Sequence, residues 1–368
     1  MSTGSRMHAP QPAAGSAAGS PSHPVRPGAV YPLRVMAQDE MFSAAFGAIR
    51  RSPRAVLGLP FLAGLLNFAV AIALMALFPS QQFMRMFLDP AAFDDPEMAW
   101  AAMGDGALWL LLMLSGFIGN LLLAMSFGLL AIPTLRAAYG LPTTLTQTLR
   151  LRARTLGWLL LHLVLLIILL SVVGVVVLVI AGLLIGLTMF IGAIVVLPAL
   201  FLLLCWVTVA LMFGPLVIVV ERRNAFQALG RSISLNRGLW WRHIGAVALL
   251  YLIGGIALTV AAIPAGIVMS IGTEIAWQSP QGQEDWLAIL VLGLSQLYDA
   301  VLAALMVALA STVVAAIYLN ARFRREALDA VLLDAAEGAQ QTETLIPGSP
   351  EHLAEHFADP AGRRDGHV

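Results

Sequence analysis

Long apolar runs separated by short polar segments dominate the pattern along the chain. A helix needs roughly 20 apolar residues, each adding about 1.5 Å, to cross about 30 Å of hydrocarbon. Several runs reach this length. The pattern predicts an all-α membrane protein with six transmembrane helices, at about 55–78, 107–133, 156–182, 190–219, 244–271 and 298–319.

The central run, from Thr155 to Val220, fits either two crossings with a tight turn or three with almost none. Arginines flank both of its ends, at Arg150, Arg152, Arg154, Arg222 and Arg223. The positive-inside rule places both flanks in the cytoplasm, so the number of crossings is even. We therefore expect two.

The charges outside the runs follow the same topology. Every basic residue is an arginine, and of the 21 all but Arg85 fall in the N-terminal region, the second and fourth connections or the C-terminal tail. The other connections carry acidic residues instead. This asymmetry predicts a multi-pass protein with both termini in the cytoplasm. The absence of lysine is typical of a GC-rich bacterial genome, so we expect the protein in a bacterial cell membrane.

A short motif recurs in the basic segments. AFGAIRRS at 45–52 and AFQALGRS at 225–232 share the pattern Ala-Phe-x-Ala-apolar-x-Arg-Ser, and LTQTLRLRAR at 145–154 is a weaker version. Each copy precedes an odd-numbered span. The chain is therefore predicted to contain three repeats, each an interfacial helix followed by a transmembrane hairpin, with the interfacial helices at about 40–51, 143–152 and 224–235.

Apolar residues in these segments are spaced to share one helix face, which is typical of a helix lying in the membrane interface. The faces are Phe42, Ala45, Phe46 and Ile49 in the first copy and Phe226, Leu229 and Ile233 in the third. A cytosolic linker that is helical by chance is the alternative. Near anionic lipid each arginine contributes about 1 kcal/mol of attraction. The predicted headgroup contacts are Arg50, Arg51, Arg54, Arg150, Arg154, Arg231, Arg237 and Arg242.

Composition agrees with a chain solvated by lipid. Hydrophobic residues make up 59% and charged residues 11%, against roughly 45 to 50% and about 25% in globular domains. The formal net charge is zero and the arginines form no continuous basic stretch, so we expect membrane lipids as partners and no nucleic acid. Cys205 is the single cysteine, which excludes a disulfide or CxxC metal site within the chain; no cofactor or metal is expected.

The two ends have a different composition. Residues 1–30 are rich in Ala, Pro, Ser and Gly and lack the apolar region of a signal peptide, so we expect a disordered tail. Residues 336–368 are predicted to be a disordered cytoplasmic tail, which leaves 31–335 as the transmembrane domain. HLAEH at 352–356 has the spacing of an inverted zinc-protease helix, but nothing nearby supplies a third ligand, so a solvated tail is the preferred interpretation.

Three stretches resemble a known family. They read PLRVMAQDEMFSAAFGAIRRSPRAVLGLP, GPLVIVVERRNAFQALGRSISLNRGLWWRHIG and IYLNARFRREALD, in this order from Tyr31 to Asp329. They are similar to actinobacterial multi-pass proteins of the glycerophosphoryl diester phosphodiesterase membrane domain family. The chain departs from that pattern at Ser43 and Ala44, at Asn320 and at Ala327, where the family has Asp-Gly, Asp and Gly.

The resemblance implies a membrane architecture without catalysis. In the proteins that give the family its label, such a region precedes a soluble phosphodiesterase barrel, which needs roughly 200 residues or more. No soluble stretch of this sequence is long enough for that barrel. The catalytic domain is therefore expected to be absent.

Four polar residues interrupt the apolar runs: Asn67, Asn120, His162 and Asp299. Two interpretations of Asp299 are open, and the first is a proton or ion role. The second is a place at the outer interface, because Asp299 lies about 34 Å of helix before Arg322. Residues 287–297 would then form a shallow outer helix. His162 is expected to bond a carbonyl rather than to sense pH. Asn67 and Asn120 are expected to bond across the first hairpin rather than to bind substrate.

Three classes of function remain open. The leading hypothesis is a non-catalytic, lipid-associated or scaffolding envelope protein. The alternative is a transporter or permease for small molecules or lipids, with the four polar residues along its pathway. An enzyme comes third, because the sequence has no nucleophile paired with a base, no metal set and no phosphate-binding loop in a suitable context.

Overall fold

The computed structural model describes residues 29–77, 96–188, 191–278, 285–338 and 346–358, and the regular structure in these ranges is helical. The helices are α1 Gln38–Arg51, α2 Pro53–Val56, α3 Gly58–Leu77, α5 Pro96–Gly104, α6 Gly106–Leu129, α7 Ala131–Ala137, α8 Leu145–Leu151, the 3-10 helix η2 Ala153–Thr155, α9 Leu156–Leu187, α10 Ala193–Leu211, α11 Gly214–Glu221, α12 Ala225–Asn236, α13 Trp240–Gln278, α14 Asp285–Glu326, α15 Leu328–Gly338 and α16 Pro350–Ala358.

Within the described residues, six helical segments are long and apolar enough to cross a membrane, as predicted. They are Pro53–Leu74, Trp109–Ala137, Ala153–Leu187, Ala193–Glu221, Trp240–Val268 and Gly293–Glu326. The second and fourth each join two helices, α6 to α7 and α10 to α11. Pro133 and Pro215 stand just after these joints, where a proline removes a backbone donor and favours a break in the helix.

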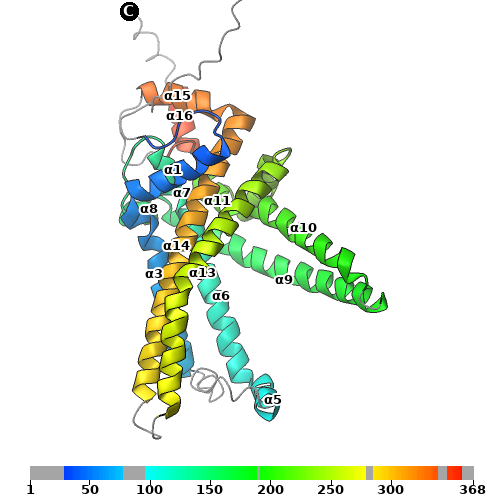
Figure 1. The fold of residues 1–368 in the computed structure, drawn as a ribbon. Helices are drawn as coiled ribbons and strands as arrows, with labels where there is room; N and C mark the ends of the chain where they lie inside the picture. The colour runs from blue at the N-terminus through cyan, green and yellow to red at the C-terminus, as the bar shows by residue number, and fades with distance from the viewer. Residues whose placement is uncertain (1–28, 78–95, 189–190, 279–284, 339–345, 359–368) are drawn as a thin grey trace, which may run out of the picture.

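The helices converge at one end of the molecule and spread apart toward the other (Figure 1). Helices α3, α13 and α14 run side by side as a long bundle, while α9 and α10 form a hairpin that projects to one side. The short helices α1, α7, α8, α11, α12, α15 and α16 gather at the convergent end. We call this end the cap.

The protein core lies in the cap and not in the middle of the spans. Helix α7, residues Gly214–Val220 of α11 and residues Ser311–Phe323 of α14 are buried throughout. By contrast, apolar side chains along the α9–α10 hairpin, such as Leu178 and Ile194, are exposed. Lipid solvates such side chains as well as protein does, so these helices need no apolar core around them.

The C-terminal residues Ile346–Ala358, which we call the strap, fold back onto the cap. The strap contains α16, and Ile346 and His352 are buried, with the His352 ring edge-on to Tyr139. The prediction of a disordered tail over 336–368 is therefore wrong for the strap and for the end of α15. Similarly Val30, assigned above to the N-terminal tail, donates its backbone N–H to the Ala137 carbonyl at 3.0 Å.

Helix α14 is continuous from Asp285 to Glu326. The separate shallow helix predicted over 287–297 is therefore wrong, since those residues continue α14, in which the sixth span begins at Gly293. The run has no proline or glycine pair that would break the helix there.

Candidate functional site

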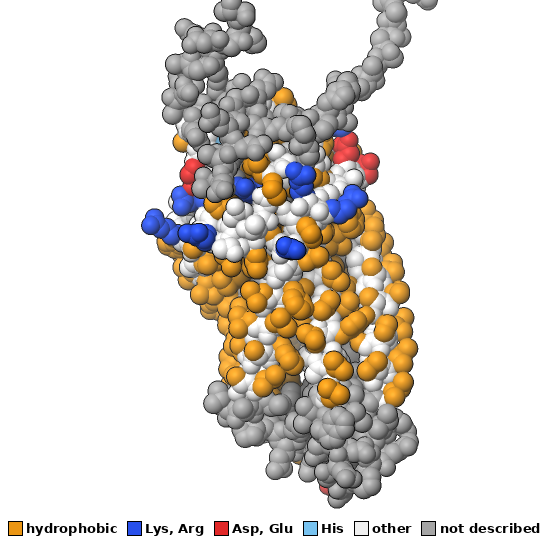
Figure 2. Space-filling view, turned by 90° about the vertical axis from the view of Figure 1, so that its left-hand side faces the viewer, with side chains coloured by type: hydrophobic (Ala, Val, Ile, Leu, Met, Phe, Trp, Pro, Cys, Tyr) orange, Lys and Arg blue, Asp and Glu red, His pale blue; other side chains and the backbone are white. Residues whose placement is uncertain are grey.

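Exposed arginines surround the cap where the spans begin. Arg50, Arg54, Arg150, Arg154 and Arg237 are exposed, and their guanidinium groups bond to no other described residue. Arg51 is also exposed and donates from Nη2 to the Gly140 carbonyl at 2.6 Å. We call these six residues the arginine belt. Figure 2 shows basic side chains gathered at one level, above a broad hydrophobic surface.

Helices α1 and α12 pack through alanines and expose phenylalanines. Ala45, Ala48, Ala225 and Ala228 are fully buried, whereas Phe46 is 49% and Phe226 66% exposed. Trp158 and Trp241 are exposed at the starts of α9 and α13. Aromatic rings beside arginines are typical of surfaces at the boundary between lipid and water.

The apolar face predicted to contact lipid is more exposed in α12 than in α1. In α12, Phe226 and Ile233 are exposed and Leu229 is half-buried. In α1, Phe42 and Ile49 pack against the core and Ala45 is buried, so only Phe46 of that face is exposed. Helix α1 packs chiefly against α14 and α7, whereas α12 packs chiefly against α11 and α10.

Two of the predicted headgroup contacts are instead used inside the cap. The Arg231 Nε donates to Glu221 Oε2 at 3.0 Å, and its Nη2 pairs with Glu326. Arg242 donates from Nη2 to the Met36 carbonyl at 3.4 Å. Burial would lower the pKa of Arg231, but the charges of Glu221 and Glu326 raise it above its ordinary value. The expectation of headgroup contact is therefore wrong for Arg231, and Arg242 faces a protein carbonyl.

Arg231 belongs to a buried ion-pair network that joins α11, α12 and α14. Glu221, whose side chain is 7% exposed, also accepts from the Tyr318 hydroxyl at 2.8 Å. The Arg322 Nε donates to Glu326 Oε2 at 2.9 Å. We call Glu221, Arg231, Arg322 and Glu326 the ion-pair network. The arrangement pairs opposite charges from three helices, so it is suited to fixing the cap.

The strap carries one carboxylate between two arginines. Arg152 Nη2 lies 3.3 Å from Glu351 Oε2, and Arg222 Nη1 pairs with the other oxygen, Oε1. The Arg152 side chain is 7% exposed, and its Nε is held by the Val219 carbonyl at 2.8 Å. Burial lowers the pKa of Arg152, partly offset by Glu351. Burial would raise the pKa of Glu351, but hydrogen bonds and these arginines lower it below its ordinary value.

His162 is buried in α9 and bonds a carbonyl, as predicted. Its Nδ1 lies 3.1 Å from the Ala225 carbonyl at the start of α12, so it ties the third span to the cap. Its Nε2 has no hydrogen-bond partner among the described residues and points at Gly214, where a Cβ would lie 2.4 Å from it. Only a glycine fits opposite this ring.

We expect Gly214→Ala to lower the stability of the protein by about 1 to 3 kcal/mol, because the new methyl group would displace His162 from its carbonyl. Gly230→Ala in α12 is the matched control, since nothing lies within 4 Å of its Cβ position. The control should be stabilised by about 0.5 to 1 kcal/mol. Thermal unfolding in detergent measures both. Equal shifts for the two variants would contradict the packing of His162 against Gly214.

Asn67 and Asn120 do not bond to each other, so the predicted bond across the first hairpin is wrong. Asn120 is exposed and donates to the Gly116 carbonyl of its own helix at 2.8 Å. The Asn67 amide lies against Gly119 of α6, and its buried Oδ1 has no hydrogen-bond partner among the described residues. The two residues nevertheless lie at the same level of the hairpin.

Asp299 is exposed, and its level is deeper than predicted. The adjacent Ala300 packs against Gly64 of α3, where a Cβ would lie 3.2 Å from that of Ala300. Gly64 follows the belt residue Arg54 by about 15 Å of helix, half of the roughly 30 Å of hydrocarbon. The estimate from Arg322 started from a different reference, because Arg322 is buried inside the cap and bonded to the Gly348 carbonyl, whereas Arg54 is exposed.

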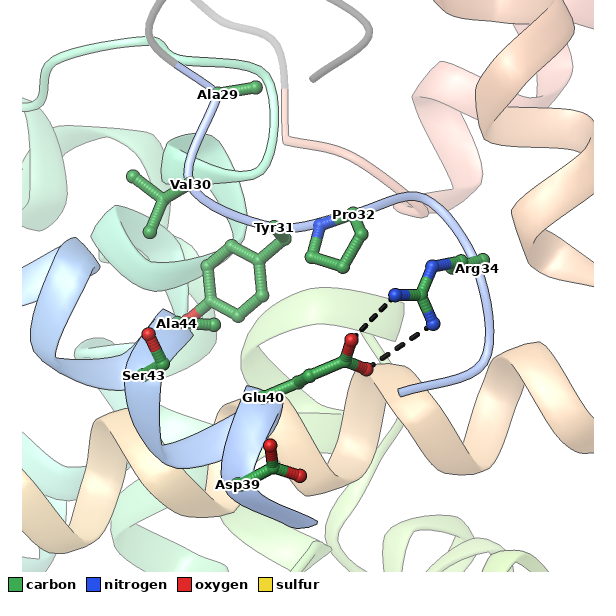
Figure 3. A pocket seen from close by; sticks show the side chains of 9 residues that line it. All are labelled: Ala29, Val30, Tyr31, Pro32, Arg34, Asp39, Glu40, Ser43 and Ala44. Atoms are coloured by element: carbon green, nitrogen blue, oxygen red, sulfur yellow. Dashed lines mark hydrogen bonds and ion pairs between the residues drawn. The ribbon is translucent and has the colours of Figure 1, made fainter. Parts of the chain in front are cut away.

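A shallow recess of about 370 Å³ lies beside the N-terminal half of α1 (Figure 3). Arg34 and Glu40 form a two-pronged ion pair on its wall, at 2.5 and 3.3 Å, and Asp39 is exposed beside them. Burial raises the pKa of the Tyr31 phenol, whose hydroxyl has no hydrogen-bond partner among the described residues. Arg34 and Glu40 are paired to each other, which leaves Asp39 as the charged residue of the lining without a partner among the described residues.

Comparison with known proteins adds a family but no activity. The part of the chain that the structure describes contains no cluster of side chains able to hold a metal ion. No curated protein matches the chain significantly, and no solved structure does. A family model matches residues 36–321, most of the chain, so the protein belongs to the family described as Domain of unknown function (DUF7847).

Proposed function

We propose that this protein is a non-catalytic scaffold of the bacterial cell membrane that binds anionic lipid headgroups through its arginine belt. The single observation that carries the proposal is that five of the six exposed belt arginines have side chains without a partner among the described residues, at the level where the apolar spans begin. Guanidinium groups bind phosphate with two parallel hydrogen bonds. The exposed Phe46, Phe226, Trp158 and Trp241 would enter the lipid beside them.

The proposal includes the orientation and the repeat. The cap faces the cytoplasm, because arginines collect on that side of a membrane and the inner leaflet carries anionic lipid. The three segments around α1, α8 and α12 are copies of one device that places a short helix before a transmembrane hairpin. In support, Ala48, Thr148 and Ala228 are all fully buried at corresponding positions, and Phe46 and Phe226 are both exposed. The likeness to the phosphodiesterase membrane domain family stays a prediction.

The belt can be tested by retention of lipid. Replacing Arg50, Arg54, Arg150, Arg154 and Arg237 by glutamine removes up to about 1 kcal/mol of attraction per residue, so bound phosphatidylglycerol should fall at least tenfold. Native mass spectrometry of the full-length protein from mixed phosphatidylglycerol and phosphatidylcholine micelles measures it.

The matched control is the same set changed to lysine, which keeps the charge and should retain most of the anionic lipid. Wild-type protein that takes up phosphatidylcholine and phosphatidylglycerol equally, with no loss in the glutamine variant, would contradict the proposed function.

A transporter is the second candidate, and one observation favours it. Asp299, Asn67 and Asn120 lie at about the same depth on three different helices, and the hydrocarbon offers a carboxylate no partner there. Intramembrane carboxylates usually belong to a pathway for ions or substrates. Loss of a transport activity in vesicles with Asp299→Asn, at unchanged expression, would favour this candidate over the scaffold.

A further inference from the structure

The strap holds a carboxylate where a membrane phosphate would lie. Arg152 and Arg222 each stand one residue outside a candidate span, the third beginning at Ala153 and the fourth ending at Glu221. Their guanidinium groups are therefore at the level of lipid headgroups. Glu351, which lies between them, comes from a segment far along the chain and from neither span.

The two arginines are arranged as a binding site. The Nε of Arg152 is fixed by the Val219 carbonyl, which directs Nη2 toward Glu351. Arg222 follows α11 and has a left-handed backbone conformation, with φ of 56°. This conformation is unfavourable for residues other than glycine and is retained where the surroundings require it. Each arginine takes one oxygen of the same carboxylate, which is the geometry that guanidinium groups also offer to phosphate.

The surroundings of the site are basic as well. Arg150 and Arg154 flank Arg152 in sequence and are exposed without partners among the described residues, while Arg223, which follows Arg222, pairs with Glu221. A phosphate with one or two negative charges would therefore meet a stronger positive potential than a single pair supplies. Glu351 neutralises only part of it.

From these contacts we propose that Arg152 and Arg222 form a phosphate-binding site that Glu351 occupies, so that the strap and a phosphate group compete for the same two arginines. The inference rests on the proposed function, since it adds a site of the same ligand chemistry to the arginine belt. A tethered group acts at an effective concentration on the order of millimolar. Headgroup phosphates at a membrane surface are dense enough to compete, and a free phosphate anion has the same chemistry.

The first experiment follows the strap. The full-length protein is placed in nanodiscs of phosphatidylcholine or of phosphatidylglycerol, and hydrogen exchange of the peptide covering 346–358 is measured. We expect roughly tenfold faster exchange in phosphatidylglycerol. If the contact between Glu351 and the two arginines is formed about 90% of the time without anionic lipid, its loss raises the open fraction of the strap about tenfold. Faster exchange in phosphatidylcholine after adding millimolar inorganic phosphate would identify free phosphate as a ligand. Equal exchange in all three conditions would overturn the proposal.

The second experiment removes the internal anion. Glu351→Gln should increase the phosphatidylglycerol retained in native mass spectrometry several-fold, and adding Arg222→Gln should abolish the increase. Arg222 is chosen because it is half-exposed, whereas Arg152 is buried and bonds the Val219 carbonyl. Glu40→Gln, which frees Arg34 from an exposed pair elsewhere on the cap, is the matched control and should leave retention unchanged.

The outcomes separate this inference from the proposed function. If the wild-type protein prefers phosphatidylglycerol, but Glu351→Gln changes neither lipid retention nor strap exchange, the strap proposal fails and the belt stands. If the glutamine variant of the belt binds as the wild type does while Glu351→Gln still raises retention, the belt fails and the Arg152–Arg222 site stands.

Discussion

Replacing Glu221 by glutamine is expected to destabilise the protein by about 2 to 4 kcal/mol, between the loss for a buried group left unsatisfied and that for a fully buried ion pair with one partner removed. The reason is that Glu221, whose side chain is 7% exposed, accepts from Arg231, Arg223 and Tyr318, and its loss leaves Arg231 with Glu326 as its remaining carboxylate among the described residues. Thermal unfolding in detergent should show a midpoint lower by roughly 4 °C or more.

Glutamine is chosen because it keeps the size of the side chain and can still accept from the Tyr318 hydroxyl. The control is Asp39→Asn, which changes one exposed carboxylate that has no partner among the described residues. A shift in this control of more than about 1 kcal/mol would point to a general effect of charge. A Glu221→Gln variant as stable as the wild type would show that the ion-pair network does not hold the cap together.

Asp299→Leu is expected to have a large effect of the opposite sign. A carboxylate at the centre of a bilayer costs about 2.5 to 3.5 kcal/mol on insertion scales, and Asp299 is exposed with no partner among the described residues. Leucine removes that cost, so the variant should insert more efficiently and unfold at a higher temperature. Glycosylation-mapped insertion and thermal unfolding measure the two changes.

Leu305→Ala is a useful control, because this exposed residue lies on the same helix and loses apolar surface without a change in charge. Lower stability of Asp299→Leu would contradict the prediction, since it would mean that Asp299 is paired in the assembled state. Unchanged folding together with loss of a transport activity would favour the transporter over the scaffold.

The spans were predictable because each depends on local composition. A helix in hydrocarbon satisfies its own backbone hydrogen bonds, so a run of apolar residues of sufficient length is enough to define it. The helices α1, α8 and α12 were predictable because their signals are also local. For example, α8 and α12 begin at side-chain caps from Thr144 and Asn224 that are visible in the sequence. The predicted bounds of the first five spans and of these helices differ from the observed ones by up to five residues, but the sixth span, predicted at 298–319, extends from Gly293 to Glu326.

The candidate site was predictable only in part. The belt arginines Arg50, Arg54 and Arg150 are exposed as predicted, but Arg231 is not, although all four lie in similar basic segments. Arg231 differs because Glu326, 95 residues away, reaches it when α14 packs beside α12. Glu351 was overlooked because its tail has the composition of a disordered segment, and its partner Arg152 lies 199 residues before it.

By itself, the sequence determined how many helices could cross a membrane and at which ends of the spans the arginines collect, because lipid solvent acts on each segment separately. Only the tertiary structure decided which arginines are available to lipid and which are neutralised inside the cap. It also decided that Ala300, next to Asp299, packs against Gly64 of α3 and that the strap is bound. The physical reason is that ion pairing and depth depend on which helices become neighbours, and in hydrocarbon apolar patterning does not select those neighbours.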